Sequence, residues 1–348
     1  MRRLTSGNEA IFQGALRAGA GYFAGYPISP TSEILQQAAV YAEDHPDFRF
    51  LQAEDEIAAA IATISASLAG AKAFTATSGP GFTLMQEALG WGHTVEAPCV
   101  FVNAMRVGPS TGMPTQPAQA DLLQIKGGSA GDYYPLAFYP HSVEECFRLT
   151  VTAFNAAEES LSPVILLSDA FLSHFYEIAD LDTIETEVAP RMKKPLGTGQ
   201  RLFTGISHDK MGNTRTSHPE IYKEWIVDLK ERHLRVARKY PLYEYFPRPG
   251  SETLLIAFGI TSRIVSPLKE RFSLFRPIRI FPVLEDELRE VTKSYRTIIV
   301  VEGSDGQYAS WVECAVGRRV SKIPCLGGGF KLRWIQGQIE ERLKGIEA

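Results

Sequence analysis

Two short segments of the chain carry side chains that could handle a proton and an anion. Three consecutive acids at positions 54–56 precede an alanine-rich stretch, IAAAIATISASLAGA, whose composition suits close, dry packing. A carboxylate held away from water there can share or transfer a proton with a ligand nitrogen. Arg106 opens a loop in which Ser110 and Thr111 stand between glycines. The planar fork of an arginine offers paired donors, so this loop is a candidate anchor for a carboxylate.

Two further segments have a restricted backbone that suits ligand contact. Ser78-Gly79-Pro80-Gly81 predicts a tight strand-to-helix turn that can approach a ligand closely. Pro27 and Pro30 fix the chain around Ser29 in the segment YPISP. Each motif also has a structural interpretation, because glycines close βα turns, Thr31-Ser32 can cap a helix, and acids favour helix N-termini.

A parallel sheet would bring these segments together. Short apolar runs alternate with helical stretches up to about residue 170, which predicts an α/β fold with helices on both faces of a parallel sheet. The carboxyl ends of such strands share one edge, where ligands bind. The segments YPISP, AEDE, SGPG and MRVGPSTG each follow a predicted strand, so all four should lie on that edge. The predicted strands are 21–26, 48–52, 73–77, 99–103 and 164–168, and the predicted helices are about 31–45, 55–70, 82–95 and 143–160.

The rest of the chain predicts a linker and a second, smaller α/β domain. The polar stretch after residue 178 contains one charged helix that begins at Pro219. Alternation then returns, which gives domains at 1–178 and 251–348 with a linker and docking helix at 179–250. The predicted strands of the second domain are 253–259, 277–281, 297–303 and 322–326.

Composition excludes several classes of function. The 348 residues include 36 basic and 40 acidic side chains, for a net charge of −4, so the chain lacks the concentrated positive charge of a nucleic-acid-binding protein. Its apolar runs are too short to span a membrane, and its first residues resemble no secretory signal. Its cysteines are far apart, which predicts reduced thiols, a cytoplasmic protein, and no metal or iron–sulfur site within the chain. They are Cys99, Cys146, Cys314 and Cys325.

Taken together, these motifs resemble the alpha subunits of the 2-oxoacid:ferredoxin oxidoreductases, most closely the 2-oxoglutarate type. The resemblance covers nearly the whole chain and weakens in TGISHDKMGN (204–213) and the second domain. The matching segments are GNEAIFQGALRAG (7–19), GYPISPTSEI (25–34), EDEIAAAIATISASLAGAKAFTATSGPGFTLMQEALG (54–90) and RVGPSTGMPTQPAQADLLQ (106–124).

The resemblance implies a pyrimidine-binding thiamine diphosphate domain followed by a domain like the C-terminal domain of transketolase. By position, Glu56 matches the glutamate that contacts the aminopyrimidine ring, Ser29 matches a hydroxyl residue of the family's YPITP loop, and Arg106 matches an arginine near the substrate carboxylate. These three are the expected catalytic residues. Expected cofactor contacts are Glu56, Pro27, Ile28, Ser78, Gly79 and Pro80, and expected substrate contacts are Ser29, Arg106, Ser110 and Thr111.

The activity implied by the resemblance is thiamine-dependent and CoA-dependent oxidative decarboxylation of a 2-oxoacid, first of all 2-oxoglutarate, with electrons passed to ferredoxin. The chain contains neither a GDG-to-Asn element for a magnesium diphosphate nor a cysteine set for a cluster. We therefore expect a beta subunit to supply the diphosphate-binding domain, Mg²⁺ and the iron–sulfur cluster, and we expect gamma and delta subunits as further partners.

Other functions stay open, because this sequence departs from the family's pattern at several positions and because some motifs have simpler structural interpretations. A non-catalytic assembly or regulatory subunit, a subunit for pyruvate or branched-chain 2-oxoacids, and a non-oxidative thiamine enzyme stay open. Ser29 replaces the usual threonine, Val107 stands where glycine is common, and residues 125–134 lack the histidine of the 2-oxoglutarate type. Asp121 is expected to cap a helix, and the turn at 304–307 is expected to contact a partner subunit. His93 and His208 are expected to be structural.

Overall fold

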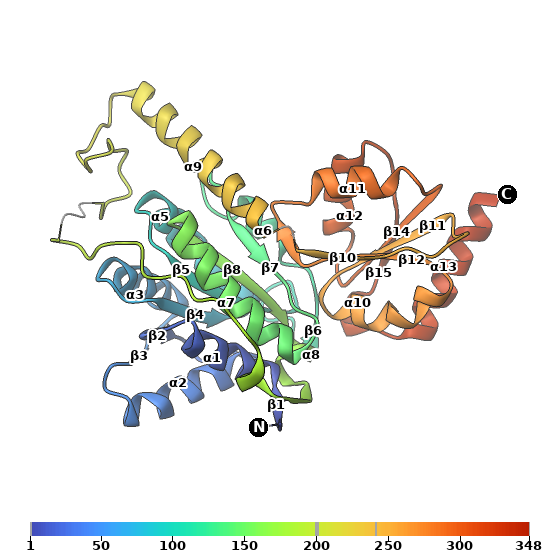
Figure 1. The fold of residues 1–348 in the computed structure, drawn as a ribbon, viewed down its shortest axis with the longest axis horizontal. Coiled ribbons are helices and arrows are strands. Elements are labelled where there is room, and N and C mark those ends of the chain that lie inside the picture. The colour runs from blue at the N-terminus through green and yellow to red at the C-terminus, as the bar shows by residue number, and fades with distance from the viewer. Residues whose placement is uncertain (1, 199–201, 241, 348) are drawn as a thin grey trace.

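The computed structural model describes residues 2–198, 202–240 and 242–347. Within these ranges the strands form an eight-stranded sheet, a five-stranded sheet and a small two-stranded sheet. The larger sheet lies in the N-terminal half and the five-stranded sheet in the C-terminal half, and they form two adjoining lobes (Figure 1). This arrangement confirms the predicted α/β class with parallel sheets.

The eight-stranded sheet carries the loops predicted to form the site. Its main order is β13-β7-β8-β5-β4-β2-β3, and β6 pairs with β5. The strands from β7 to β3 are parallel, whereas β13 and β6 pair antiparallel with their neighbours. The bounds are β2 (Tyr22–Gly25), β3 (Arg49–Gln52), β4 (Ala73–Thr77), β5 (Cys99–Val107), β6 (Met113–Pro117), β7 (Leu136–Phe138), β8 (Pro163–Asp169) and β13 (Arg279–Phe281).

Helices cover both faces of this sheet because its strands are apolar on both sides. Val100 and Val102 of β5 pack in the cluster that includes α1, α2 and α7, whereas Phe101 packs in the cluster that includes α3 and α5. Alternate side chains of a strand point to opposite faces, which explains the division. The helices of this part are α1 (Gly7–Arg17), α2 (Ser32–Asp44), α3 (Glu56–Leu68), α4 (Gly79–Leu84), α5 (Gln86–Thr94), α6 (Leu122–Gly127), α7 (Val143–Ser160) and α8 (Ala170–His174).

The C-terminal half is built on a five-stranded sheet of order β10-β12-β11-β14-β15. The segment before it carries α9 (Pro219–Lys239), which projects from the first lobe with the irregular chain that precedes it (Figure 1). The remaining strands are β1 (Arg3–Ser6), β9 (Tyr176–Ala179), β10 (Tyr243–Phe246), β11 (Thr253–Ala257), β12 (Ser273–Pro277), β14 (Thr297–Glu302) and β15 (Ser321–Pro324). The remaining helices are α10 (Gly259–Val265), α11 (Glu285–Thr292), α12 (Gln307–Val316) and α13 (Leu332–Glu347).

The predicted strand at 277–281 was wrong in its extent and partner. Residues 273–277 form β12 in the second sheet, and residues 279–281 form β13, which joins the first sheet beside β7. Pro277 has no amide hydrogen to continue a ladder, which explains why β12 ends there. Because β13 crosses from one half to the other, the domain limits at 178 and 251 remain a prediction.

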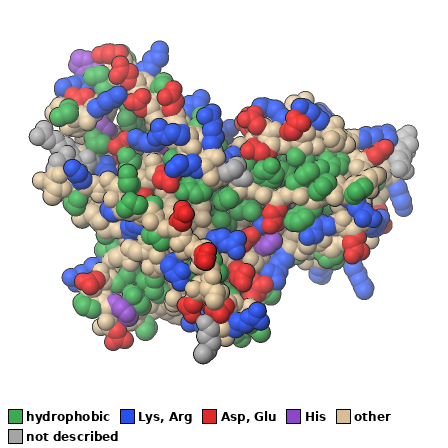
Figure 2. Space-filling view, viewed as in Figure 1, with side chains coloured by type: hydrophobic (Ala, Val, Ile, Leu, Met, Phe, Trp, Pro, Cys, Tyr) green, Lys and Arg blue, Asp and Glu red, His purple; other side chains and the backbone are tan. Residues whose placement is uncertain are grey.

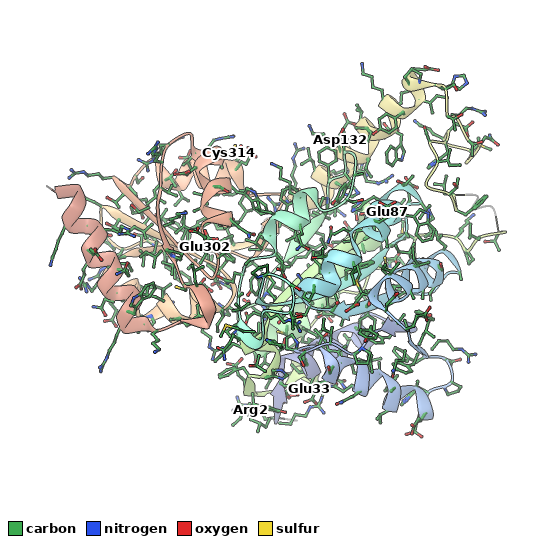
Figure 3. All side chains as sticks on the ribbon, turned by 180° about the vertical axis from the view of Figure 1, so that it is seen from behind. Arg2, Glu33, Glu87, Asp132, Glu302 and Cys314 are labelled. Atoms are coloured by element: carbon green, nitrogen blue, oxygen red, sulfur yellow. The ribbon has the colours of Figure 1, made fainter. Side chains whose placement is uncertain are left out.

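The visible surface (Figure 2) carries charges of both signs, and the cysteines are not paired. Figure 2 shows basic and acidic side chains interspersed over the visible face, with no large area of one sign. All four cysteines are free, and three are buried, whereas Cys314 is exposed on α12 (Figure 3). None of the helices in the described ranges is long and apolar enough to cross a membrane.

A buried ion pair joins the two lobes. The guanidinium of Arg276, on β12, is 1% exposed and donates to both carboxylate oxygens of Glu145, on α7, at 2.6 and 2.9 Å. Its Nε donates to Glu244 at 2.8 Å. Burial opposes the charge of Arg276, but the hydrogen bonds and charges of Glu145 and Glu244 raise its pKa overall. The pair therefore holds β12 against the start of α7.

Replacing Arg276 with methionine should lower the free energy of unfolding by about 3 kcal/mol, because it leaves the Glu145 carboxylate buried without its partner. Chemical denaturation of the variant measures the change. The matched control is Arg271→Met, since Arg271 forms a half-exposed pair with Glu340 and should leave the midpoint nearly unchanged. Equal midpoints for both variants would contradict a structural role of the buried pair.

Candidate functional site

The carboxyl ends of four adjacent strands form the edge that carries the candidate site. β5, β4, β2 and β3 are neighbours in that order and run parallel, so the chain leaves all four on the same side of the sheet. The segments YPISP, AEDE, SGPG and MRVGPSTG lie at these ends, as the sequence predicted. This is also the place where ligands bind in open α/β sheets.

The acidic triplet before α3 divides into three environments. Glu54 is exposed. Asp55 caps the helix, because its Oδ1 accepts a hydrogen bond of 2.7 Å from the amide of Ala58. Glu56 is the first residue of the helix and is 6% exposed. Across the described ranges no group donates a hydrogen bond to its carboxylate, so Glu56 is a nearly buried acid whose oxygens are available to a ligand.

Glycine at position 81 makes this placement of Glu56 possible. A Cβ at position 81 would lie 2.5 Å from Glu56 Oε1 and 2.7 Å from Glu56 Cγ, and it would also overlap Thr77 Oγ1. Such distances are well inside van der Waals contact, so a side chain there would displace the carboxylate. The SGPG turn therefore allows a close approach to the Glu56 side chain, and its predicted approach to a ligand stays a prediction.

Arg106 lies near the end of β5 with its side chain buried. Its Nη1 donates to the carbonyl of Ser29 at 2.7 Å, while its Nε is buried without a hydrogen-bond partner in the described ranges. Burial lowers the pKa of Arg106, and the negative charges of Asp121 and Glu56 oppose that effect. The guanidinium is thus a cation in a desolvated place, with donor capacity left for an anion.

A cavity of about 660 Å³ opens beside Arg106. Its wall includes Gly79, Pro80 and Ser110 from the predicted site residues. Thr111 is exposed and lies outside this wall. The wall also does not include Glu56, Pro27, Ile28, Ser29 or Ser78. Its lining residues are Gly79, Pro80, Thr83, Arg106, Gly108, Pro109, Ser110, Ala120, Asp121, Gln124, Asp305 and Gln307.

The residues around the YPISP and SGPG turns differ in exposure. Ser29 is exposed, and its backbone carbonyl, rather than its hydroxyl, meets Arg106. Ser78 is fully buried, and its Oγ has no partner in the described ranges. Thr31 precedes α2 without capping it, because its hydroxyl donates to the carbonyl of Ile28. The structural interpretation of the residues at 31–32 as a side-chain cap was therefore wrong.

Sequence analysis missed Asp121 as a site residue. Asp121 precedes α6 but makes no side-chain hydrogen bond to that helix, so the predicted cap was wrong. Its carboxylate instead lines the cavity and accepts a hydrogen bond of 3.1 Å from Asn103 Nδ2. Burial raises the pKa of Asp121 to about 6, although Asn103 and Arg106 both act to lower it.

The turn at 304–307 explains why the Asp121 side chain does not cap α6. Gln307 Oε1 accepts hydrogen bonds from the amides of Leu122 and Leu123 at 3.0 and 3.2 Å, and its Nε2 donates to Ala120. The second lobe thereby caps α6. Glu302 fixes this turn, because its buried carboxylate accepts from the amides at the start of α12 (Figure 3). In this structure the turn contacts the first lobe of its own chain, and sequence analysis missed that contact.

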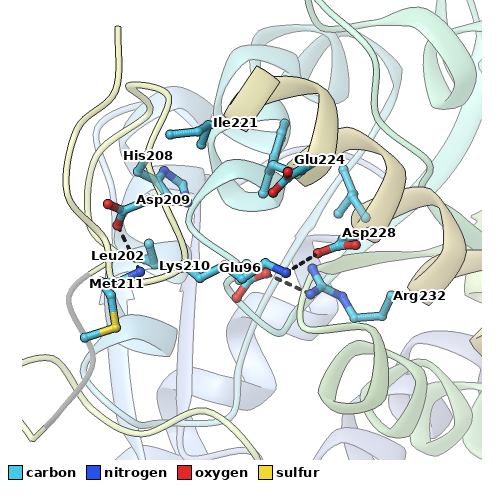
Figure 4. A pocket seen from close by; sticks show the side chains of 12 residues that line it. Glu96, Leu202, His208, Asp209, Lys210, Met211, Ile221, Glu224, Asp228 and Arg232 are labelled. Carbon is cyan, nitrogen blue, oxygen red and sulfur yellow. Dashed lines mark hydrogen bonds and ion pairs between the residues drawn. The ribbon is translucent and has the colours of Figure 1, made fainter. Parts of the chain in front are cut away.

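A second cavity, of about 590 Å³, lies between the 202–211 segment and α9 (Figure 4). Two ion pairs at this place are Arg232–Glu96 at 2.8 Å and Lys210–Asp228 at 3.1 Å. His208 lines the cavity, is 6% exposed and contacts the carbonyl of Ile206. None of the predicted site residues reaches this cavity. In the described ranges no three His, Cys, Asp or Glu side chains are grouped to hold a metal ion.

Comparison with protein families finds one that spans most of the chain. The family described as pyruvate flavodoxin/ferredoxin oxidoreductase, thiamine diphosphate-binding, matches residues 13–241. The 2-oxoglutarate synthase subunit KorA of Methanothermobacter marburgensis is 36% identical over 92% of this chain and 94% of its own length. The ketoisovalerate oxidoreductase subunit VorB of the same organism is 34% identical over 97% of both chains.

Solved structures agree with these relatives. A 2-oxoglutarate:ferredoxin oxidoreductase from Magnetococcus marinus, with 2-oxoglutarate, coenzyme A and succinyl-CoA bound, superposes with a TM-score of 0.90 at 26% identity. The match covers 98% of this chain and 65% of that one. A split-gene transketolase, at 12% identity and a TM-score of 0.58, shares the fold over 92% of this chain and 89% of that one.

These matches over most of the chain show that the protein belongs to the pyruvate flavodoxin/ferredoxin oxidoreductase family, as an alpha subunit of the 2-oxoacid:ferredoxin oxidoreductase type.

Proposed function

We propose that this chain binds the pyrimidine half of thiamine diphosphate and the carboxylate of a 2-oxoacid, and that it acts with a partner subunit in oxidative decarboxylation. The observation that carries the proposal is Glu56, a nearly buried acid without a hydrogen-bond donor, at the start of α3. The charges of Glu56 and Arg106 are close enough to interact. A proton-handling acid and a carboxylate anchor therefore lie at one sheet edge.

The residues present fit the ring of the cofactor. Glu56 offers a carboxylate to a ring nitrogen, Gly81 leaves room beside it, and Ser78 Oγ is buried without a partner. Thiamine diphosphate, when bound, would supply a nucleophilic carbon and a cationic ring that takes up the electron pair left when carbon dioxide departs. The role of Glu56 is to hold a proton at the ring nitrogen, and the neighbouring backbone of Pro27 and Ile28 completes the expected contacts.

Arg106 and the hydroxyl groups near it are proposed to hold the 2-oxoacid. The guanidinium keeps an unpartnered buried Nε, and Ser110 is in the same cavity wall. Ser29 and Thr111 are exposed beside this site, so their contacts would be made on the open side. Gly79 and Pro80 line the same cavity as Ser110.

A partner subunit is proposed for the diphosphate, Mg²⁺ and the iron–sulfur cluster. In the described ranges no group of three or more His, Cys, Asp or Glu side chains is placed to hold a metal ion. Three apolar residues near the site are about half exposed. Their exposed fractions are 49% for Ile57, 49% for Leu84 and 53% for Leu123. Leu84 and Leu123 adjoin Thr83 and Gln124, which hydrogen-bond to each other at the cavity wall. We assign this apolar edge to the interface with a beta subunit. Gamma and delta subunits and ferredoxin are proposed as further partners, and CoA is proposed as the acyl acceptor.

We propose 2-oxoglutarate as the first candidate substrate. Two relatives that are matched over 94% of their length are named 2-oxoglutarate synthase subunits. Branched-chain 2-oxoacids are the second candidate, supported by the relatives named ketoisovalerate oxidoreductase. Rates of the reconstituted complex with 2-oxoglutarate, 2-oxoisovalerate and pyruvate decide between them.

Glu56→Gln should lower the rate of viologen reduction by the reconstituted complex by at least about 100-fold, because an amide cannot hold the proton at the ring nitrogen. Subunit assembly, followed by gel filtration, should be unchanged. The matched control is Glu54→Gln, an exposed acid of the same triplet, which should keep the rate of the unmodified complex. A normal rate for Glu56→Gln would refute the proton role.

Arg106→Ala should raise KM for the 2-oxoacid by roughly 10-fold to 100-fold, since a charge-assisted contact to the carboxylate is lost. Steady-state kinetics measures the change. Arg106→Lys should give an intermediate KM, because lysine keeps the charge but lacks the planar fork. An unchanged KM in the alanine variant would show that Arg106 does not hold the carboxylate.

Gly81→Ala should reduce activity by at least about tenfold, because the added Cβ displaces Glu56 from its close-packed place. The control is Gly337→Ala on α13, where a Cβ meets no atom within 4 Å. The control should keep full activity and gain slightly in thermal midpoint. Equal activities of the two variants would contradict the role of the SGPG turn.

A further inference from the structure

The amide of Asn103 and the carboxylate of Asp121 form an incomplete buried pair, of which Asp121 lines the cavity beside Arg106. Asn103 Nδ2 donates to Asp121 Oδ2 at 3.1 Å, but Asn103 Oδ1 is buried without a donor in the described ranges. An ionised carboxylate has no proton to offer, so the amide oxygen stays unsatisfied, at a cost of about 1–3 kcal/mol. Protonation of Asp121 would place a hydrogen-bond donor next to this amide.

Asp121 is also placed to respond to a ligand in the cavity. It is 8% exposed and lines the same cavity as Arg106. Both of its oxygens face the SGPG turn, because a Cβ at Gly79 would lie 3.4 Å from Oδ2 and 3.5 Å from Oδ1. Since Gln307 caps α6, the Asp121 carboxylate has no structural task at the helix.

We propose that Asp121 takes up a proton when an anionic ligand binds to Arg106, so that the bound anion does not share the guanidinium with a second negative charge. This inference rests on the proposed role of Arg106 as carboxylate anchor. An ionised Asp121 competes with the ligand for the positive charge of Arg106, whereas a neutral Asp121 leaves that charge to the ligand. Asp121 is then a positioning residue that keeps Arg106 for the ligand carboxylate.

Other charged groups around Asp121 do not replace it. Arg106 stabilises its anion, and Glu56 on α3 bears on the same guanidinium. Asp305 is exposed at the cavity wall and pairs with Lys322 at 2.9 Å. Tyr139, buried near the lobe boundary, donates to Asp169, and the charge of Asp121 helps to raise its pKa. Arg106, Glu56, Asp305 and Tyr139 all remain in a variant that changes Asp121 alone.

The sign of the pH dependence follows from these groups. Burial raises the pKa of Asp121 to about 6 without a ligand, and a nearby anion raises it further. Anion affinity should therefore be highest at low pH, where Asp121 is already neutral. Above pH about 6 the affinity should fall by up to roughly tenfold per pH unit, because each binding event then requires uptake of one proton.

The test is isothermal titration calorimetry of oxamate, a mimic of the 2-oxoacid carboxylate, with the reconstituted complex in the absence of an electron acceptor. The unmodified complex should take up at least about half a proton per oxamate near pH 7, measured by comparing two buffers of different ionisation heat. Asp121→Asn should show no uptake and a Kd independent of pH. At pH about 8 the variant should bind oxamate roughly tenfold more tightly than the unmodified complex, and at pH about 5.5 equally well.

Asp305→Asn is the matched control, an acid at the same cavity that is exposed and should leave the proton uptake unchanged. Infrared difference spectra upon oxamate binding should contain a protonated carboxyl band that Asp121→Asn lacks, which keeps the test valid if that variant loses stability. Weaker binding by Asp121→Asn at all pH values would assign it a merely structural role and overturn the proposal. So would the absence of oxamate binding or of proton uptake in the unmodified complex. Turnover of a 2-oxoacid without proton uptake contradicts only this inference, whereas loss of turnover contradicts the proposed function.

Discussion

The close approach of the SGPG turn to the first turn of α3 is the constraint on which the site depends. Gly81 packs against Glu56 so tightly that no side chain fits between them. The alanine-rich composition of α3 allows the same closeness along its length, where Ala59 and Ala60 are fully buried. Small residues therefore do more than fill a core here, because they allow an acid to pack closely at a sheet edge.

The positive charge of Arg106 is stabilised by carboxylates that are nearby but not hydrogen-bonded to it. Arg106 keeps its hydrogen bond to the backbone of Ser29, and the carboxylates of Glu56 and Asp121 affect it through their fields. A buried arginine paired directly with an acid, such as Arg276 with Glu145, is a structural link whose donors are used. Arg106 differs because its Nε is left without a partner. An anion-binding site needs hydrogen-bond donors that no protein group already uses. Because such donors are removed from water, their hydrogen bonds to an anion are strong.

The sequence predicted the first lobe well because its signals are local. Apolar runs, Asp55 before α3 and the glycines after β4 each mark their own element, and parallel topology then places the four loops on one edge without further information. Asp121 and β13 could not be assigned in this way. The position before α6 has the residue type of a cap, and only a residue 186 positions later makes that cap unnecessary. β13 likewise follows from pairing with β7 rather than from its own composition.

The contact of Gln307 with the start of α6 shows how the second lobe contributes to the site without adding a charged group to it. A helix N-terminus buried at a lobe boundary needs an acceptor, and either Asp121 or a residue from across the boundary can provide it. Because Gln307 provides it, a neutral amide satisfies α6, and the acid keeps its oxygens for the cavity and for Asn103. The boundary between the lobes thereby sets which of the two side chains caps α6. Glu302 supports this arrangement, because its buried carboxylate accepts hydrogen bonds from the amides of Tyr308 and Ala309, next to Gln307.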